Sequence, residues 1–184
     1  MGADRCFSDT PHTVCQESNV VFTAAIAFAI RTGGPPKRIH HHALETLLRA
    51  GASPIVLRCL HEAESRPPVD YERQQGWVLV ALQNAFYQLL HAPSLEERVV
   101  DTVRNGGDTD TNGAIAGALL GALWGLPAIP RQWLDCILDC RPQDGRRGVL
   151  QPQPREIGQS MSWELAARML GKGGLPELRM LTSP

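Results

Sequence analysis

Residues 104–125 read RNGGDTDTNGAIAGALLGALWG, and no other stretch of the chain carries as much information. Asp108 and Asp110 stand two residues apart, among glycines and threonines, directly before a strongly apolar run. Closely spaced carboxylate and hydroxyl oxygens suit a hard divalent cation such as Mg²⁺, Mn²⁺ or Ca²⁺. We therefore expect the acidic segment (residues 104–113) to be a cation-binding candidate that leads into a buried helix.

The helix after the acidic segment carries glycine at every fourth position. These residues are Gly113, Gly117, Gly121 and Gly125. Each costs about 1 kcal/mol relative to alanine inside a helix. Because these glycines share one face of the helix, we expect the backbone of another helix to pack very closely against that face. Such packing would hold the acidic segment rigidly.

Apolar residues at helical spacing dominate the rest of the chain, and strand alternation is nearly absent. Ser94 and Glu97 have the spacing of a capping box, and prolines and glycines separate the other helices. We expect helices over about residues 16–31, 37–50, 54–64, 76–90, 95–104, from 111 onward, 130–138 and 162–170, with a loop at 141–159. The sequence predicts an all-α fold in a single compact domain over residues 1–184.

Bulk composition excludes several classes of function. The 184 residues are 43% hydrophobic with a net charge of −1. The sequence therefore lacks the excess of Lys and Arg that is typical of nucleic-acid-binding proteins. The longest apolar stretch, residues 114–129, is shorter than the roughly 20 residues of a membrane span. Five widely spread cysteines without a Cys-x-x-Cys motif favour reduced thiols. We expect a cytoplasmic protein with no nucleic-acid or membrane partner.

Two local interpretations compete with a catalytic cation site. In the first, Asp110 or Thr111 merely caps the following helix, although capping needs one polar residue and this segment has five in a row. In the second, Asp108, Asp110 and Asn112 begin a calcium loop of the EF-hand kind. That pattern fails at its twelfth position, where Leu119 replaces the required glutamate.

Residues 106–112 (GGDTDTN), with the apolar run 114–122 after them, resemble the C-terminal signature of the ADP-ribosylglycohydrolase family. The stretches 76–83 and 128–133 resemble the family as well, so the likeness covers about residues 10–140. The likeness is to the C-terminal portion of the family. It implies an all-helical fold and a hydrolase that uses two Mg²⁺ or Mn²⁺ ions to release ADP-ribose from modified protein side chains or small ADP-ribose conjugates.

The resemblance also implies roles for particular residues. The metal ligands would be Asp108, Asp110 and Thr111, with Asp110 bridging two ions, while Thr109 and Asn112 would support them. The family usually has a histidine that contacts the ADP-ribose diphosphate, and His12 lies two residues after that position. By the same resemblance, we expect His12, Gly106 and Gly107 to bind the substrate. We expect the triplet at residues 40–42 to lie on a partly exposed helix face rather than at a metal.

The sequence departs from the family in one important respect. The family's Thr-Asp-Asp metal motif and an acidic residue that assists catalysis have no counterpart, because the chain contains no Asp-Asp pair. We therefore expect at most a partial metal site and assign no catalytic residue. Three hypotheses stay open: a hydrolase completed by another chain, a non-catalytic relative that binds metal or ADP-ribose, and a truncated remnant. Apolar surface left uncovered would favour a homo-oligomer.

Overall fold

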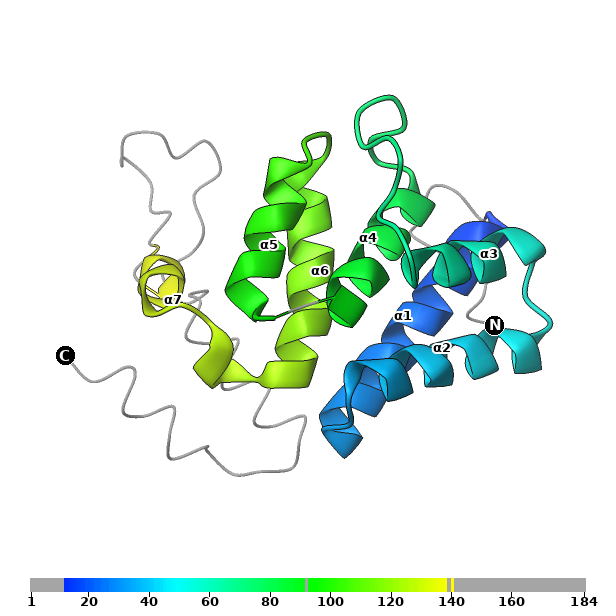
Figure 1. The fold of residues 1–184 in the computed structure, drawn as a ribbon, viewed down its shortest axis with the longest axis horizontal. Coiled ribbons are helices and arrows are strands. Elements are labelled where there is room, and N and C mark those ends of the chain that lie inside the picture. The colour runs from blue at the N-terminus through cyan, green and yellow to red at the C-terminus, as the bar shows by residue number, and fades with distance from the viewer. Residues whose placement is uncertain (1–11, 92, 139, 141–184) are drawn as a thin grey trace, which may run out of the picture. The chain divides into compact units, whose positions relative to one another are not determined.

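The computed structural model describes residues 12–91, 93–138 and 140. Within these residues all regular structure is helical, and no strand occurs (Figure 1). The elements are α1 (Thr13–Thr32), α2 (Pro36–Ala50), α3 (Pro54–Ala63), α4 (Val78–His91), α5 (Leu95–Arg104), α6 (Thr109–Trp124), the short 3-10 helix η2 (Leu126–Ala128) and α7 (Arg131–Leu138). The all-α prediction is confirmed. The expected loop at 141–159 and helix at 162–170 lie outside the described residues.

The chain divides into two compact units, the first ending at Ile129 and the second beginning at Pro130. The first unit contains helices α1 to α6 and η2, and every site residue discussed below belongs to it. In the second unit the structure describes α7. The expectation of a single domain over residues 1–184 stays a prediction.

Local signals explain where the helices begin and end. The α2 helix has Pro36 in its first turn and ends at Gly51, which adopts a left-handed conformation (φ 64°). The α5 helix begins after Ser94, whose hydroxyl accepts a hydrogen bond from the backbone N–H of Glu97 at 3.2 Å. This is the cap that the sequence predicts.

The α4 helix is the centre of the first unit, as its apolar sequence predicts. It contacts each of the other five α-helices of the unit (Figure 1). Phe86 and Leu89 on this helix are completely buried. Each fully buried side chain of this size contributes about 1.5–3 kcal/mol, so these two residues of α4 add substantially to the stability of the core.

A polar network crosses this core and connects α4 to α5. Asn84 of α4 is completely buried, and its amide donates to the Thr102 hydroxyl at 3.1 Å. The Tyr71 hydroxyl, from the chain before α4, donates to the Asn84 carbonyl oxygen at 2.9 Å. Gln88, one turn later, donates to the Asp101 carboxylate at 2.7 Å. The network therefore fixes the segment around Tyr71 against the central helix.

The expected close approach of another helix backbone to the glycine face of α6 is wrong. Gly113 and Gly117 do lie against α5, but α5 presents valine side chains there rather than its backbone. A Cβ atom added at Gly113 would lie 3.7 Å from a methyl carbon of Val103, and one at Gly117 would lie 3.8 Å from a methyl carbon of Val99. Gly125 lies outside the helix, where it ends α6 with φ 73°.

Because a Cβ fits at Gly117, we expect Gly117→Ala to stabilise the protein. The gain should be about 0.5–1 kcal/mol, since alanine restricts the unfolded chain and favours the helix. Urea denaturation of the wild type and the variant measures this gain as a shift in the unfolding midpoint. A loss of stability would mean that α5 cannot accept the added methyl group.

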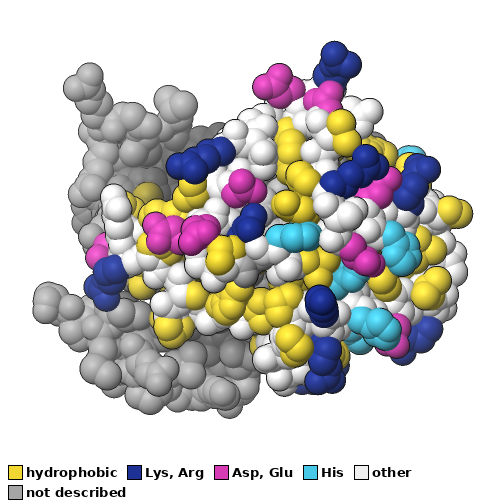
Figure 2. Space-filling model, in the orientation of Figure 1, with side chains coloured by type: hydrophobic (Ala, Val, Ile, Leu, Met, Phe, Trp, Pro, Cys, Tyr) yellow, Lys and Arg dark blue, Asp and Glu magenta, His cyan; other side chains and the backbone are white. Residues whose placement is uncertain are grey.

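The surface of the described residues shows no concentration of positive charge on the face seen in Figure 2. Lys and Arg side chains lie there among Asp and Glu side chains, in keeping with the net charge of −1. Of the described helices, only α1 is long and apolar enough to cross a membrane. A core helix of a soluble protein passes the same test of length and composition. The expectation of no membrane partner stays a prediction.

Candidate functional site

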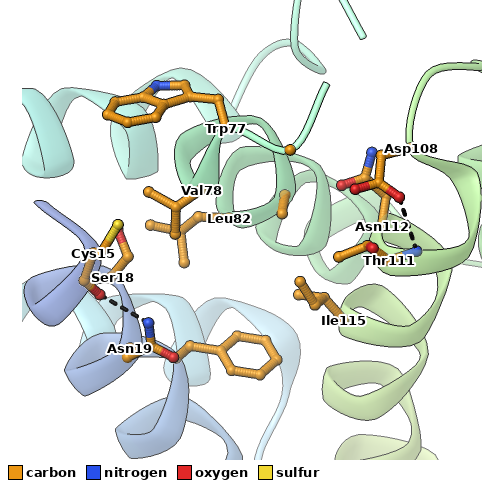
Figure 3. Close-up of a pocket in the computed structure, with 13 residues that line it drawn as sticks. Cys15, Ser18, Asn19, Trp77, Val78, Leu82, Asp108, Thr111, Asn112 and Ile115 are labelled. Atoms are coloured by element: carbon orange, nitrogen blue, oxygen red, sulfur yellow. Dashed lines mark hydrogen bonds between the residues drawn. The ribbon is translucent and has the colours of Figure 1, made fainter. Parts of the chain in front are cut away.

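A cavity of about 370 Å³ opens where α1, the start of α4 and the start of α6 meet (Figure 3). Residues of α1 line one side, residues of α6 line the other, and Val78 and Leu82 of α4 lie between them. The lining residues that matter below are Cys15, Ser18, Asn19, Phe22, Trp77, Asp108, Thr111 and Asn112. The cavity thus brings part of the acidic segment next to α1, about 90 residues earlier in the chain.

Asp108 directly precedes α6 and lies at the cavity. Its carboxylate accepts a hydrogen bond from the Thr111 backbone N–H at 3.4 Å, which makes Asp108 the N-cap of the helix (Figure 3). We expected the helix to begin after Asp110, and this boundary is wrong by two residues. The competing interpretation named Asp110 or Thr111 as the cap, whereas the cap is Asp108. Capping leaves the carboxylate with further lone pairs that are available to a ligand.

Asp110 lies in the first turn of α6, exposed to solvent and close to Asp108. A hydrogen bond with the Asp108 side chain lowers the pKa of the Asp110 carboxyl, and backbone N–H groups of Thr111 and Asp110 act in the same direction. The two carboxyl groups therefore converge. Thr111, the third expected ligand, is exposed and lines the cavity beside them.

Gly106 and Gly107 form the turn that positions Asp108. Both have positive φ, 78° and 68°, a conformation that side chains with a Cβ rarely adopt. The carbonyl oxygen of Tyr71 lies so close to Gly107 that a Cβ atom there would be 1.9 Å from it. The Tyr71 segment, fixed to α4 by the buried polar network, therefore sets the position of the acidic segment.

The remaining expected residues occupy supporting positions. His12 caps α1, accepting from the Val14 backbone N–H at 3.3 Å, and its ring lies 6.0 Å from that of Trp77, a cavity residue. Asn112 is 4% exposed and lines the cavity. Thr109 is the first residue of α6 and is not among the described lining residues. The substrate-binding and supporting roles of these residues stay predictions.

The donor set at the start of α6 fits a partly hydrated Mg²⁺ or Mn²⁺ ion. Mg²⁺ usually keeps several water ligands and is held by one or two carboxylates, which Asp108 and Asp110 can supply. Within the described residues, no group of three or more His, Cys, Asp and Glu side chains is placed to hold a metal ion. The expectation of at most a partial metal site stays a prediction.

The three histidines at residues 40–42 lie in different environments. His40 is buried, with Nε2 3.0 Å from the Leu60 carbonyl oxygen, and burial lowers its pKa. His41 is exposed, and His42 stacks on Phe28 at 4.3 Å between ring centroids. The helix face is therefore partly exposed, as expected.

Sequence reasoning missed the α1 side of the cavity. Ser18 and Asn19 are polar residues near the start of a helix, where such residues are common, so nothing in the sequence distinguished them. Phe22 reads as an ordinary core position. Only the tertiary packing of α1 against α6 brings these three residues opposite Asp108.

Comparison with known proteins gives one consistent result. Residues 3–168 match the family model described as ADP-ribosylglycohydrolase. The chain is 49% identical over 43 residues to a protein of Acanthamoeba polyphaga mimivirus named as an ADP-ribosyl glycohydrolase, covering 23% of this chain and 13% of the relative. It is 32% identical over 62 residues to the dinitrogen reductase ADP-ribosyl glycohydrolase of Rhodospirillum rubrum, covering 34% and 21%. The aligned stretches thus span less than a quarter of these relatives. No solved structure matches the chain significantly.

Proposed function

Because the chain belongs to the ADP-ribosylglycohydrolase family, we propose that it is a Mg²⁺- or Mn²⁺-dependent hydrolase. It would release ADP-ribose from ADP-ribosylated proteins or from small ADP-ribose conjugates. The observation that carries this proposal is the position of the acidic segment. Asp108 and Thr111 lie at the wall of a cavity, and the Asp110 carboxyl converges with that of Asp108.

In this proposal Asp108, Asp110 and Thr111 hold the cation. A bound divalent ion would orient the ribose hydroxyls and bring a water molecule to the anomeric carbon. Asp108 contributes carboxylate oxygen while capping α6, so the rigid start of the helix orients it. Gly106 and Gly107 give the turn its shape, and the Tyr71 segment keeps it in place.

We expect the protein to bind Mn²⁺ weakly, and Asp110→Asn to weaken this binding at least about tenfold. Replacing a charged ligand by a neutral one of the same shape removes most of the attraction for a hard cation. Isothermal calorimetry with manganese chloride measures both dissociation constants. Glu45→Gln on α2 makes the same chemical change at another exposed carboxylate and serves as the matched control. Equal heats from all three proteins would contradict the proposal.

A binding protein without turnover is the second candidate. It is favoured by the partial ligand set, since the described residues hold no group of three acidic, His or Cys side chains at the cavity or elsewhere. The assay that separates the two candidates is release of ADP-ribose from an ADP-ribosylated arginine or serine peptide with Mn²⁺ present. Release supports the hydrolase, whereas Mn²⁺ binding without release supports the binding protein.

A further inference from the structure

His40 of α2 closes the C-terminal end of α3. The residue is 5% exposed, and its Nε2 atom lies 3.0 Å from the carbonyl oxygen of Leu60. In a continuous helix this carbonyl would accept from the backbone N–H of Glu64, but that N–H bonds to the His61 carbonyl oxygen at 3.1 Å instead. The imidazole of His40 therefore satisfies a terminal carbonyl group of α3 from a neighbouring helix.

The hydrogen bond to Leu60 determines which ring nitrogen of His40 carries a proton. A carbonyl oxygen can only accept, so Nε2 carries the hydrogen in the neutral ring, and a second proton would have to go to Nδ1. The nearby carboxylate of Glu64 is 3.9 Å from Nδ1, too far for a hydrogen bond, and it also lies 3.3 Å from Nδ1 of His61. On the α4 side the ring meets Phe86, which offers no oxygen or nitrogen acceptor. Within the part of the chain that the structure describes, a proton on Nδ1 would therefore have no hydrogen-bond acceptor.

The surroundings of His40 oppose its charged form more than they favour it. Burial lowers the pKa of His40, because the protonated ring would lose its hydration. The Leu60 carbonyl and the Glu64 carboxylate act in the opposite direction, whereas the neighbouring histidines His41 and His61 add to the lowering. The net shift of the pKa is downward, so the ring of His40 is neutral in the folded protein at neutral pH.

Side chains of other helices hold α3 at its start and in its middle. The carboxylate of Glu17 on α1 accepts from the backbone N–H of Ser53, just before α3, at 3.1 Å, and also from the Ser53 hydroxyl. The thiol of Cys59 lies 3.4 Å from the Leu79 carbonyl oxygen of α4. Loss of the His40 hydrogen bond would therefore leave these two attachments in place and free only the C-terminal end of α3.

We propose that His40 is an acid-sensitive latch between α2 and α3. The neutral ring holds the C-terminal end of α3 against α2, and a second proton, on Nδ1, loosens that contact. Since the pKa of His40 is lower in the folded protein than its ordinary value of 6.5, the unfolded chain takes up this proton first. The stability of the fold is therefore unaffected by the latch well above pH 6.5, and it falls as the pH falls through that value, until the folded protein also binds the proton. The inference does not depend on the proposed hydrolase activity.

The test compares urea denaturation of the full chain at about pH 8 and about pH 5, the range in which histidine side chains change charge. In His40→Gln the side-chain amide can still donate to the Leu60 carbonyl, but it does not titrate. We expect the ratio of folded to unfolded wild type to fall, relative to that of His40→Gln, by up to about tenfold for each pH unit between the two pKa values. His41→Gln, which replaces the exposed histidine one position later, should keep the pH dependence of the wild type. Equal pH dependence in the wild type and His40→Gln would overturn the inference.

Two further measurements separate the latch from a general effect of acid on the fold. NMR titration of the wild type, which does not require that His40→Gln folds, should place the His40 midpoint below 6.5. Glu64→Gln should lower this midpoint further, because it removes a negative charge that favours the protonated ring. In acid, the backbone amides at the C-terminal end of α3 should lose more hydrogen-exchange protection than those at its start. A His40 midpoint at or above 6.5, a midpoint that Glu64→Gln does not lower, or equal loss of protection along α3 would contradict the latch.

Discussion

Gly107→Ala is expected to lower the free energy of unfolding by about 2–5 kcal/mol. Two costs add at this position. An alanine at φ 68° occupies the left-handed region, which costs roughly 1–2 kcal/mol. Its Cβ would also lie 1.9 Å from the Tyr71 carbonyl oxygen, so backbone must move, and overpacking of this kind costs about 1–3 kcal/mol.

Gly51→Ala provides the matched control for this prediction. Gly51 has nearly the same conformation, with φ 64°, but no described atom lies within 4 Å of an added Cβ. It should therefore show only the conformational cost of roughly 1–2 kcal/mol. Urea denaturation of both variants measures the difference. Equal losses of stability would show that the Tyr71 contact does not constrain the acidic segment.

Asp108→Asn is expected to lower the rate of Mn²⁺-dependent ADP-ribose release at least about 100-fold with little change in stability. Asparagine caps a helix as well as aspartate does, so α6 should keep its start and the protein its fold. The loss of the charged ligand removes several kcal/mol of electrostatic stabilisation, and each 1.36 kcal/mol corresponds to a factor of ten in rate. Release assays together with urea denaturation separate the two roles of this side chain.

The control for this experiment is Glu45→Gln. Glu45 is an exposed carboxylate on α2 and is not among the described residues that line the cavity. Its replacement should leave ADP-ribose release unchanged. If Asp108→Asn released ADP-ribose at the rate of the wild type, Asp108 would not be a metal ligand. If the wild type released none, the hydrolase proposal would fail.

The helices were predictable because their signals are local. Proline in the first turn of α2, glycine at its end and the Ser94 cap of α5 each act within a few residues. The start of α6 was less predictable, because each polar residue from Asp108 to Asn112 can cap a helix. The choice of Asp108 depends on the two left-handed glycines before it and on Tyr71, which lies 37 positions before Asp108 in the numbering of the chain.

Which residues pack against a given side chain or helix face was not predictable from residue spacing alone. The glycine spacing predicts one shared helix face, but only the structure shows that valine side chains of α5 meet Gly113 and Gly117 and that Gly125 lies outside the helix. In the sequence, Asn84 is only a polar residue within a mostly apolar helix. Its partners Tyr71 and Thr102 lie 13 and 18 residues away, so its place in a buried network could not be inferred. Ser18 was missed for the same reason, because its significance depends on the cavity.

Tyr71 spans the distance between the core and the acidic segment. Its hydroxyl is fixed to Asn84 of the central helix, and its carbonyl oxygen lies against Gly107. One residue thus works as a spacer of fixed length between two parts of the chain that are not neighbours in sequence. An insertion or deletion beside Tyr71 is therefore not a local change in a surface loop, because the displacement reaches Asp108 through a single backbone contact.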